Sequence, residues 1–142
     1  MATLERAIEI AVTAHKGQVD KVGEAYILHP LRVMHRVQSK DEMIVGVLHD
    51  VIEDTEWTAE SLKQDGFSDE VLHSLGCLTR GDETYEEFIE RASRDPVARK
   101  VKLADLEDNM DIRRLPAITE KDEKRLAKYL RAWRQLLGRG VK

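Results

Sequence analysis

The segment that most limits the fold covers residues 43–54 and reads Met-Ile-Val-Gly-Val-Leu-His-Asp-Val-Ile-Glu-Asp. Seven of its first ten residues are aliphatic or methionine, so a helix built from them is apolar on every side. This pattern predicts a buried central helix and not an amphipathic surface helix. A buried helix has to be surrounded by other elements, which points to a helical bundle.

Four ionisable residues stand at the end of this apolar segment: His49, Asp50, Glu53 and Asp54. Burying such groups is costly unless something compensates their charge, and a metal cation is the usual partner of this residue set. Neighbouring residues lie roughly 100° apart round a helix, so two of them can bind a metal ion while the next turn reaches its water. Taken alone, the pattern also fits a core histidine followed by a solvated helix end.

Composition limits the class of protein. The 142 residues are enough for one domain, residues 1–142, with its own core. The 42% hydrophobic and 35% charged residues, with 8 Gly and 3 Pro, favour a mostly helical soluble protein. The net charge of −4 argues against bulk nucleic-acid binding, and we find no apolar segment long enough to cross a membrane. Cys77, the single cysteine, excludes an internal disulfide, and a reducing cytoplasm is the expected location.

Capping residues divide the chain into helices. The expected caps are Thr3, Ser39 with Glu42, Thr58, Ser68, Thr84 with Glu87, Asp95 before Pro96, and Thr119 with Asp122. Helices are expected over residues 4–15, 59–64, 69–78, 85–94, 96–113 and 120–137, with Gly138 ending the last one. Pro30 suits the first turn of another helix and is expected to hold His29 in an extended conformation. No segment alternates in the manner of a strand, so the predicted fold class is all-α.

Asp105 supplies the second half of the expected site. It lies among apolar neighbours, with Lys102 and Asn109 about one turn away on a similar face. By itself such an acid is more often an exposed helix residue. Together with His29, His49 and Asp50 it completes a set of two imidazoles and two carboxylates, which suits Mn²⁺, Fe²⁺ or Zn²⁺. The absence of thiolates disfavours a structural zinc site.

The order of these residues, His29, then His49-Asp50, then Asp105, resembles the HD-domain metal-dependent phosphohydrolases, an all-α family. Four motifs make the resemblance closer. Residues 14–18 (Ala-His-Lys-Gly-Gln), 21–31, 48–55 and 101–105, with Asn109, are similar to the hydrolase domain of the RelA/SpoT alarmone enzymes. Without an attached synthetase domain, the chain is similar to the stand-alone small alarmone hydrolases (Mesh-type).

This resemblance implies a role for each matching residue. One Mn²⁺ would be held by His29, His49, Asp50 and Asp105. Glu53 and Asp54 would orient and deprotonate the attacking water, and pyrophosphate would be released from the 3′ position of guanosine tetra- or pentaphosphate. The implied substrate contacts are Lys21, Arg32, Lys102 and Asn109. Without the resemblance, Lys21, Arg32 and Lys102 would be interpreted as ordinary surface cations, and Asn109 as an amide at a helix end.

The sequence also departs from the family. Asp20 stands where alarmone hydrolases usually have an arginine that can stack on the base, and an anion cannot replace that guanidinium. Leu106 replaces the basic residue that commonly follows the late aspartate, and Glu107 and Asp108 make this neighbourhood more acidic. An adenosine alarmone therefore stays open beside the guanosine one.

Several alternatives remain open at this stage. A different HD nucleotidase would release orthophosphate from another nucleotide, and a non-catalytic nucleotide-binding module would bind without turnover. Arg80 lies in a loop that could approach substrate, whereas Tyr129 and Trp133 are expected in the core. No role in catalysis is expected for His15, His35 or His73. The expected partner is a small-molecule nucleotide, and an apolar strip on the last helix could serve a homodimer.

Overall fold

The computed structural model describes residues 2–141, with side chains through residue 138, and its regular elements are helices. They are α1 (Leu4–His15), α2 (Leu28–His35), α3 (Lys40–Leu48), α4 (Val51–Asp54), α5 (Ala59–Gln64), α6 (Asp69–Cys77), α7 (Tyr85–Ser93), α8 (Pro96–Asn109) and α9 (Glu120–Val141). A 3₁₀ turn, Ile112–Arg114, lies between α8 and α9. Within residues 2–141 the β pairing consists of one isolated bridge, Val19 with Ala25. The predicted all-α fold class is confirmed.

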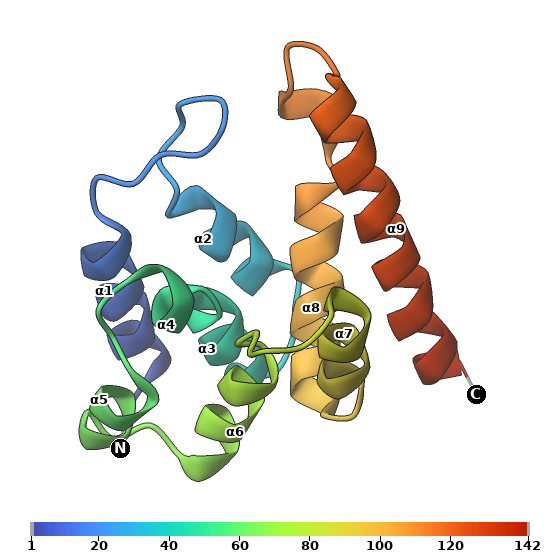
Figure 1. The fold of residues 1–142 in the computed structure, drawn as a ribbon. Helices are drawn as coiled ribbons and strands as arrows, with labels where there is room; N and C mark the ends of the chain where they lie inside the picture. Colours follow the sequence, from blue (N-terminus) through green and yellow to red (C-terminus); the bar gives the residue numbers. More distant parts are fainter. Residues whose placement is uncertain (1, 142) are drawn as a thin grey trace.

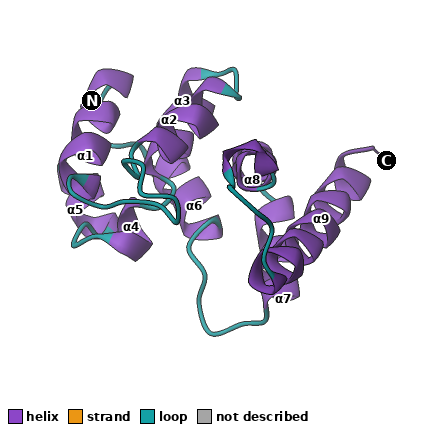
Figure 2. Ribbon diagram, turned by 90° about the horizontal axis from the view of Figure 1, so that it is seen from above, coloured by secondary structure: helices purple, strands orange, loops and turns teal. Residues whose placement is uncertain are grey.

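The helices form two groups that meet along α8. Helices α1 to α6 lie on one side of α8 and α9 on the other in both views, and Figure 2 shows α7 on the side of α9 (Figures 1 and 2). Ala98, Val101 and Ala104 of α8 join the larger core, which α1 to α6 build together with Ala92 of α7. Leu106 joins a smaller core made by α7 and α9. Since α8 contributes to both cores, it holds the two groups in one arrangement.

Most helices begin at the predicted caps. The hydroxyl of Thr3 accepts a hydrogen bond from the backbone N–H of Arg6, 3.1 Å away. Ser39 with Glu42 forms a reciprocal capping box at the start of α3, and Thr84 with Glu87 forms another at α7. A cap of this kind stabilises a helix by about 1 kcal/mol, because it satisfies backbone N–H groups that have no partner in the helix.

The predicted central helix is wrong in one respect, because it is broken at His49 and Asp50. Helix α3 ends at Leu48, and α4 begins at Val51. The cause lies in the His49 ring, whose Nδ1 is 2.6 Å from the carbonyl oxygen of Gly46. In a continuing helix the backbone N–H of Asp50 would bond to that carbonyl. The ring therefore ends the helix, and the catalytic candidates Glu53 and Asp54 lie on a separate short helix.

The expected extended conformation of His29 is also wrong. His29 is the second residue of α2, and its backbone N–H bonds to the carbonyl of Tyr26 at 3.0 Å. This turn overrides the preference that Pro30 imposes on the preceding residue, and a proline is tolerated in a first helical turn. Helix α2 packs closely on α3, since a Cβ added at Gly46 would lie 3.4 Å from Cα of Met34. This close contact brings His29 near His49.

Two predicted helix ends differ from the structure. Helix α8 ends at Asn109 and not near Arg113, because the Asp111 side chain accepts the Arg113 N–H and begins the 3₁₀ turn. Helix α9 continues through Gly138 to Val141. Gly138 is not among the glycines with positive φ, so it does not take the left-handed conformation that ends a helix. A helix tolerates an interior glycine at a cost of about 1 kcal/mol.

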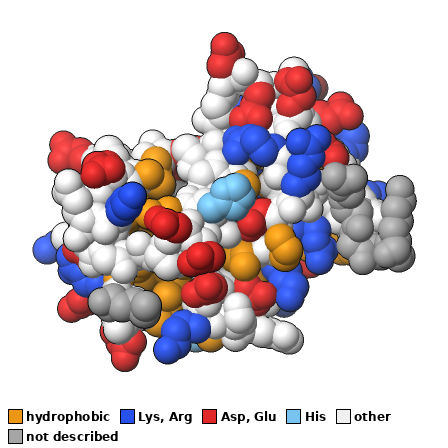
Figure 3. All heavy atoms as spheres, turned by 90° about the horizontal axis from the view of Figure 1, so that it is seen from below, with side chains coloured by type: hydrophobic (Ala, Val, Ile, Leu, Met, Phe, Trp, Pro, Cys, Tyr) orange, Lys and Arg blue, Asp and Glu red, His pale blue; other side chains and the backbone are white. Residues whose placement is uncertain are grey.

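Other expectations concern the core and the surface. Cys77 is buried in the larger core. Among the described residues, the structure contains no helix that is both long and apolar enough to span a membrane. Acidic and basic side chains lie interspersed on the face drawn in Figure 3, and no broad basic surface covers the part of that face that is described.

Candidate metal centre and active site

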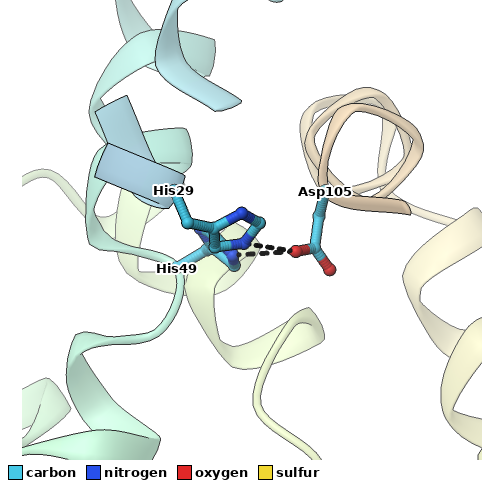
Figure 4. Close-up of side chains that lie close together, drawn as sticks. All are labelled: His29, His49 and Asp105. Carbon is cyan, nitrogen blue, oxygen red and sulfur yellow. Dashed lines mark hydrogen bonds and ion pairs between the residues drawn. The ribbon is translucent and has the colours of Figure 1, made fainter. Parts of the chain in front are cut away.

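Two imidazole rings and one carboxylate converge at the junction of the two helix groups (Figure 4). Nε2 of His29 lies 2.8 Å from Oδ1 of Asp105, and Nε2 of His49 lies 3.3 Å from the same oxygen. One ligand atom from each residue lies within 4.8 Å of the other two. All three side chains are buried. Helices α2 and α8 and the end of α3 thus bring three potential metal-binding atoms together.

The other ring nitrogens fix the orientation of both histidines. Nδ1 of His49 faces the Gly46 carbonyl at 2.6 Å, and Nδ1 of His29 faces Oδ2 of Asp108 at 2.7 Å. A carbonyl and an ionised carboxylate only accept hydrogen bonds, so each Nδ1 carries the donated proton. Nε2 of both rings faces Asp105, so a bound metal ion would replace the proton on Nε2 and take its lone pair, which is the usual arrangement of metal-binding histidines.

Asp50, the fourth predicted ligand, lies beside this trio. Its Oδ2 is 3.1 Å from Nε2 of His49 and 3.9 Å from Nε2 of His29. The hydroxyl of Tyr26 donates a short hydrogen bond to the same oxygen. Asp50 is not a member of the mutually close set formed by His29, His49 and Asp105. Its nearer contact with that set is His49, and the farther one is His29.

The electrostatics of this cluster favour a positive charge. Burial alone would lower the pKa of His49, but the carboxylates of Asp50 and Asp105 raise it well above its ordinary value. Burial would raise the pKa of Asp105, but Lys102 and the two histidines hold it well below the usual range. The site thus stabilises cationic charge among ionised carboxylates, which is the charge that a divalent metal supplies. Imidazole nitrogen and carboxylate oxygen suit Mn²⁺, Fe²⁺ or Zn²⁺, so the residues fit such an ion.

Asp108 is a site residue that sequence reasoning missed. It is fully buried, and besides His29 it accepts a 2.7 Å hydrogen bond from Nε of Arg32. Oxygens that orient metal-binding histidines in this way are important for metal affinity. The signal in the sequence was spacing, since Asp105 and Asp108 lie three residues apart and hence on similar faces of one helix.

Replacing Asp108 with asparagine should destabilise the protein. It would leave the charge of Arg32 without its buried partner, and breaking a buried pair in this way costs about 3 kcal/mol. We expect that loss in the free energy of unfolding, measured by urea denaturation. The matched control is Glu107→Gln, which removes the neighbouring half-exposed carboxylate and should cost about 1 kcal/mol or less. Equal losses in the two variants would contradict this assignment.

The same carboxylate should make stability depend on acid pH. Burial alone would raise the pKa of Asp108, but hydrogen bonds from His29 and Arg32 lower it to about 2. A carboxyl with a lowered pKa in the folded state stabilises the protein above its ordinary pKa, and this contribution disappears as the pH falls. Wild type should therefore lose about 2 kcal/mol from this group between about pH 4 and pH 2. Asp108→Asn should lack that component when both unfold across the same pH range.

The two candidate catalytic acids differ in position. Glu53 lines a cavity together with His49 and Asp105, and its Oε1 accepts the backbone N–H of Arg80 at 2.6 Å. Asp54 ends α4 and is not among the residues that line this cavity. Burial and the charges of Asp50 and Glu53 raise the pKa of Asp54. Glu53 is thus the better-placed acid.

Two cavities flank the three converging side chains. We call the first the loop-side cavity; its volume is about 320 Å³, and it includes Val19, Asp20, Lys21, Val22, Arg32, Arg114 and Leu115. We call the second the α9-side cavity; its volume is about 260 Å³, and it includes His49, Asp50, Glu53, Arg80, Lys102, Asp105 and Lys128. Tyr26, His29 and Asn109 line both. A ligand lying across the metal-binding residues would therefore reach both cavities.

The four expected substrate contacts lie at these cavities, and all four have protein partners nearby. Lys102 donates to Oδ2 of Asp105 at 2.8 Å, and Asn109 donates to Oδ1 at 3.2 Å. Arg32 is engaged with Asp108. Lys21 is half-exposed at the loop-side cavity, with Nζ 3.6 Å from Asp122. Lys102, Arg32 and Asn109 thus also hold the acidic residues of the site in place.

The aromatic residues of α9 divide between core and cavity. Trp133 packs against the smaller core, and its Nε1 donates to Glu107 at 3.0 Å. Tyr129 packs against the same core and also lines the α9-side cavity. Both residues pack against the core as expected, but Tyr129 is a cavity residue as well.

Comparison with known proteins places this geometry in context. No family model matches the chain. It is 33% identical over 150 residues to a GTP pyrophosphokinase of Streptomyces coelicolor, covering 96% of this chain and 18% of that protein. It is 31% identical over 138 residues to a guanosine-3′,5′-bis(diphosphate) 3′-pyrophosphohydrolase of Aquifex aeolicus, covering 88% of this chain and 19% of that protein. The chain thus spans about a fifth of the length of the curated relatives it matches.

A solved structure shares the fold. It is described as a metazoan ortholog of SpoT that hydrolyses ppGpp, and it matches with a TM-score of 0.78 and 21% identity. The match covers 96% of this chain and 86% of that one. By sequence and by fold, the chain resembles the hydrolase domain of the RelA/SpoT proteins, and its fold is all-α.

Proposed function

We propose that this protein is a metal-dependent hydrolase that removes the 3′-diphosphate of a nucleotide alarmone, (p)ppGpp or (p)ppApp, as pyrophosphate. The observation that carries the proposal is the convergence of His29, His49 and Asp105 at a point that opens into two cavities. The pyrophosphohydrolase of Aquifex aeolicus and the metazoan structure support the same reaction class. Other relatives are named GTP pyrophosphokinase, but about four fifths of their length lies outside the match.

Each step of the proposed reaction can be assigned to residues of this chain. A divalent ion held by His29, His49, Asp50 and Asp105 would polarise a phosphoryl oxygen and make water acidic enough to lose a proton near neutral pH. Glu53 would accept that proton as the water oxygen bonds to the phosphorus next to the ribose, while Asp54 orients the water. The bond between this phosphorus and the 3′ oxygen breaks, the 3′ oxygen takes up a proton, and pyrophosphate leaves. We propose Mn²⁺ as the ion, with Fe²⁺ or Zn²⁺ as alternatives.

The loop-side cavity would hold the nucleoside. Its apolar walls, Val19, Val22 and Leu115, suit a flat base, and Asn109 lies between it and the metal-binding residues. The carboxylate of Asp20 accepts the backbone N–H groups of Val22 and Glu24, each at 3.0 Å, so it shapes the loop. Arg32 and Arg114 bring guanidinium groups to this cavity. Either could stack on a base in place of the missing arginine, so both guanine and adenine remain substrates in the proposal.

Direct product analysis tests the proposal. Protein loaded with Mn²⁺ is incubated with ppGpp, with ppApp and with simple mononucleotides, and the products are separated by anion exchange. We expect pyrophosphate from at least one alarmone, loss of turnover after chelation, and recovery on adding Mn²⁺. Orthophosphate from a mononucleotide with no alarmone turnover would instead indicate a general nucleotidase. Tight alarmone binding without turnover would indicate a non-catalytic binding module.

The substrate contacts by Lys21, Arg32, Lys102 and Asn109 and the HD-type assignment of residues 1–142 rest on sequence resemblance. The single domain is inferred from chain length, the cytoplasmic location from the lone cysteine, and the homodimer from the apolar strip on the last helix. Each stays a prediction.

A further inference from the structure

We propose that Lys128 and Arg80 bind the terminal phosphate of the 3′-diphosphate, the group that leaves as part of pyrophosphate, at the α9 wall of the α9-side cavity. This inference rests on the proposed function and deepens it. It adds a subsite for the leaving group, built by residues that were not among the expected phosphate contacts.

The position of the reacting atoms determines which end of the substrate lies in which cavity. His49, Asp50, Asp105 and Glu53 all line the α9-side cavity, whereas His29 is the one expected ligand that also lines the loop-side cavity. The reacting phosphorus must lie beside the metal-binding residues and within reach of Glu53. With the nucleoside in the loop-side cavity, the terminal phosphate then points into the α9-side cavity.

Lys128 is suited to receive that phosphate. It lies on α9 and is partly buried, with Nζ 4.3 Å from the centroid of the Tyr85 ring and 5.8 Å from that of Tyr129. Among the described residues, no carboxylate lies within ion-pair distance of Nζ. A cation held on aromatic rings without a carboxylate partner remains available to an anion.

Arg80 adds a second cation at the same wall. Its guanidinium carbon lies 5.6 Å from the centroid of the Tyr85 ring, and a terminal nitrogen donates to the backbone carbonyl of Glu83 at 3.3 Å. Lys102 lies deeper in the cavity and is bound to Asp105. The α9-side cavity is therefore acidic at the metal-binding end and basic at the α9 end. A diphosphate that bridges the two ends would match this polarity.

The charges around Lys128 also favour an anion at the α9 wall. Burial, and then the charges of Arg80, Lys102 and Arg125, lower the pKa of Lys128. Arg80 and Lys102 line the same cavity as Lys128, and an anion bound there would compensate the repulsion between these like charges.

The test uses inorganic pyrophosphate as the probe and calorimetry as the readout, so it does not depend on turnover. Lys128→Met keeps most of the aliphatic stem and removes the charge. We expect Mn²⁺-loaded Lys128→Met to bind pyrophosphate about 10-fold more weakly than wild type, because a hydrogen bond to a charged group is lost. Lys128→Arg should restore most of the affinity. Lys124→Met, an exposed position one turn earlier on α9, should bind pyrophosphate as wild type does.

A second measurement locates the contact on the substrate. Lys128→Met should weaken inhibition by pyrophosphate but leave unchanged the inhibition by a nucleoside 5′-diphosphate 3′-monophosphate, which lacks the terminal phosphate. Wild-type pyrophosphate affinity in Lys128→Met would overturn the inference, even if the alarmones are hydrolysed. Conversely, pyrophosphate binding that depends on Lys128 in a protein without alarmone turnover would support the subsite and refute the proposed function.

Discussion

His49→Ala should abolish both metal binding and turnover. The substitution removes one of the two Nε2 atoms that face Asp105, and it also frees the Gly46 carbonyl that the ring holds. Losing an outer partner of a metal ligand costs about 10- to 100-fold in metal affinity or activity, so losing the ligand itself should cost more. Metal content after dialysis against Mn²⁺, measured by mass spectrometry, and pyrophosphate release are the two readouts.

His35→Ala is the matched control for this result. His35 ends the same helix that carries His29, but its side chain is exposed. It should keep wild-type metal content and rate. Circular dichroism separates loss of the site from loss of the fold in His49→Ala. A folded, metal-free His49→Ala protein with full activity would refute the metal-dependent mechanism.

Glu53→Gln should keep the metal and lose the rate. Glutamine retains a carbonyl oxygen that can accept the Arg80 N–H, so the contact between α4 and the Arg80 loop should survive. It cannot take a proton from water as a carboxylate does, and the loss of a positioned base costs about 100- to 10,000-fold in rate. The expected effect is on kcat with little change in KM, measured with metal-loaded protein on the better alarmone.

Glu56→Gln provides the comparison, because Glu56 is exposed and follows α4 by two residues. It should hydrolyse substrate at the wild-type rate. If Glu53→Gln keeps the wild-type rate as well, the base is a different group. Asp54, whose pKa is raised, would then be the next residue to replace.

Local signals in the sequence predicted most helix starts. Ser39 with Glu42 and Thr84 with Glu87 form the expected capping boxes, because capping depends on residues only three positions apart. The predicted helix ends were less accurate. Gly138 was expected to stop α9, but a glycine ends a helix only where the chain takes a left-handed turn, and neighbouring packing decides that.

His29, His49 and Asp105, three of the four metal ligands expected from the sequence, lie close together, while the fourth, Asp50, lies beside them, and the ligand set stays a prediction. The break at His49 was not foreseeable from periodicity, because it arises from a bond between its own ring and the Gly46 carbonyl. The sequence indicated only that Asp108 makes its neighbourhood more acidic, whereas the structure buries it as the partner of His29 and Arg32. Lys128 and Arg80 meet at one cavity only because α9 folds back along α7 and α8, which a local pattern does not contain.

Because the fold is divided along α8, the stability of the protein should depend on bound metal. His29 and His49 come from the group α1 to α6, whereas Asp105 comes from α8, 76 residues after His29. An ion bound by all three would act as a reversible cross-link between distant parts of the chain. By mass action, a free ion concentration 100 times the dissociation constant would add about 2.7 kcal/mol to the stability of the folded state. The supply of divalent ions would then set the stability of the folded protein as well as its rate of catalysis.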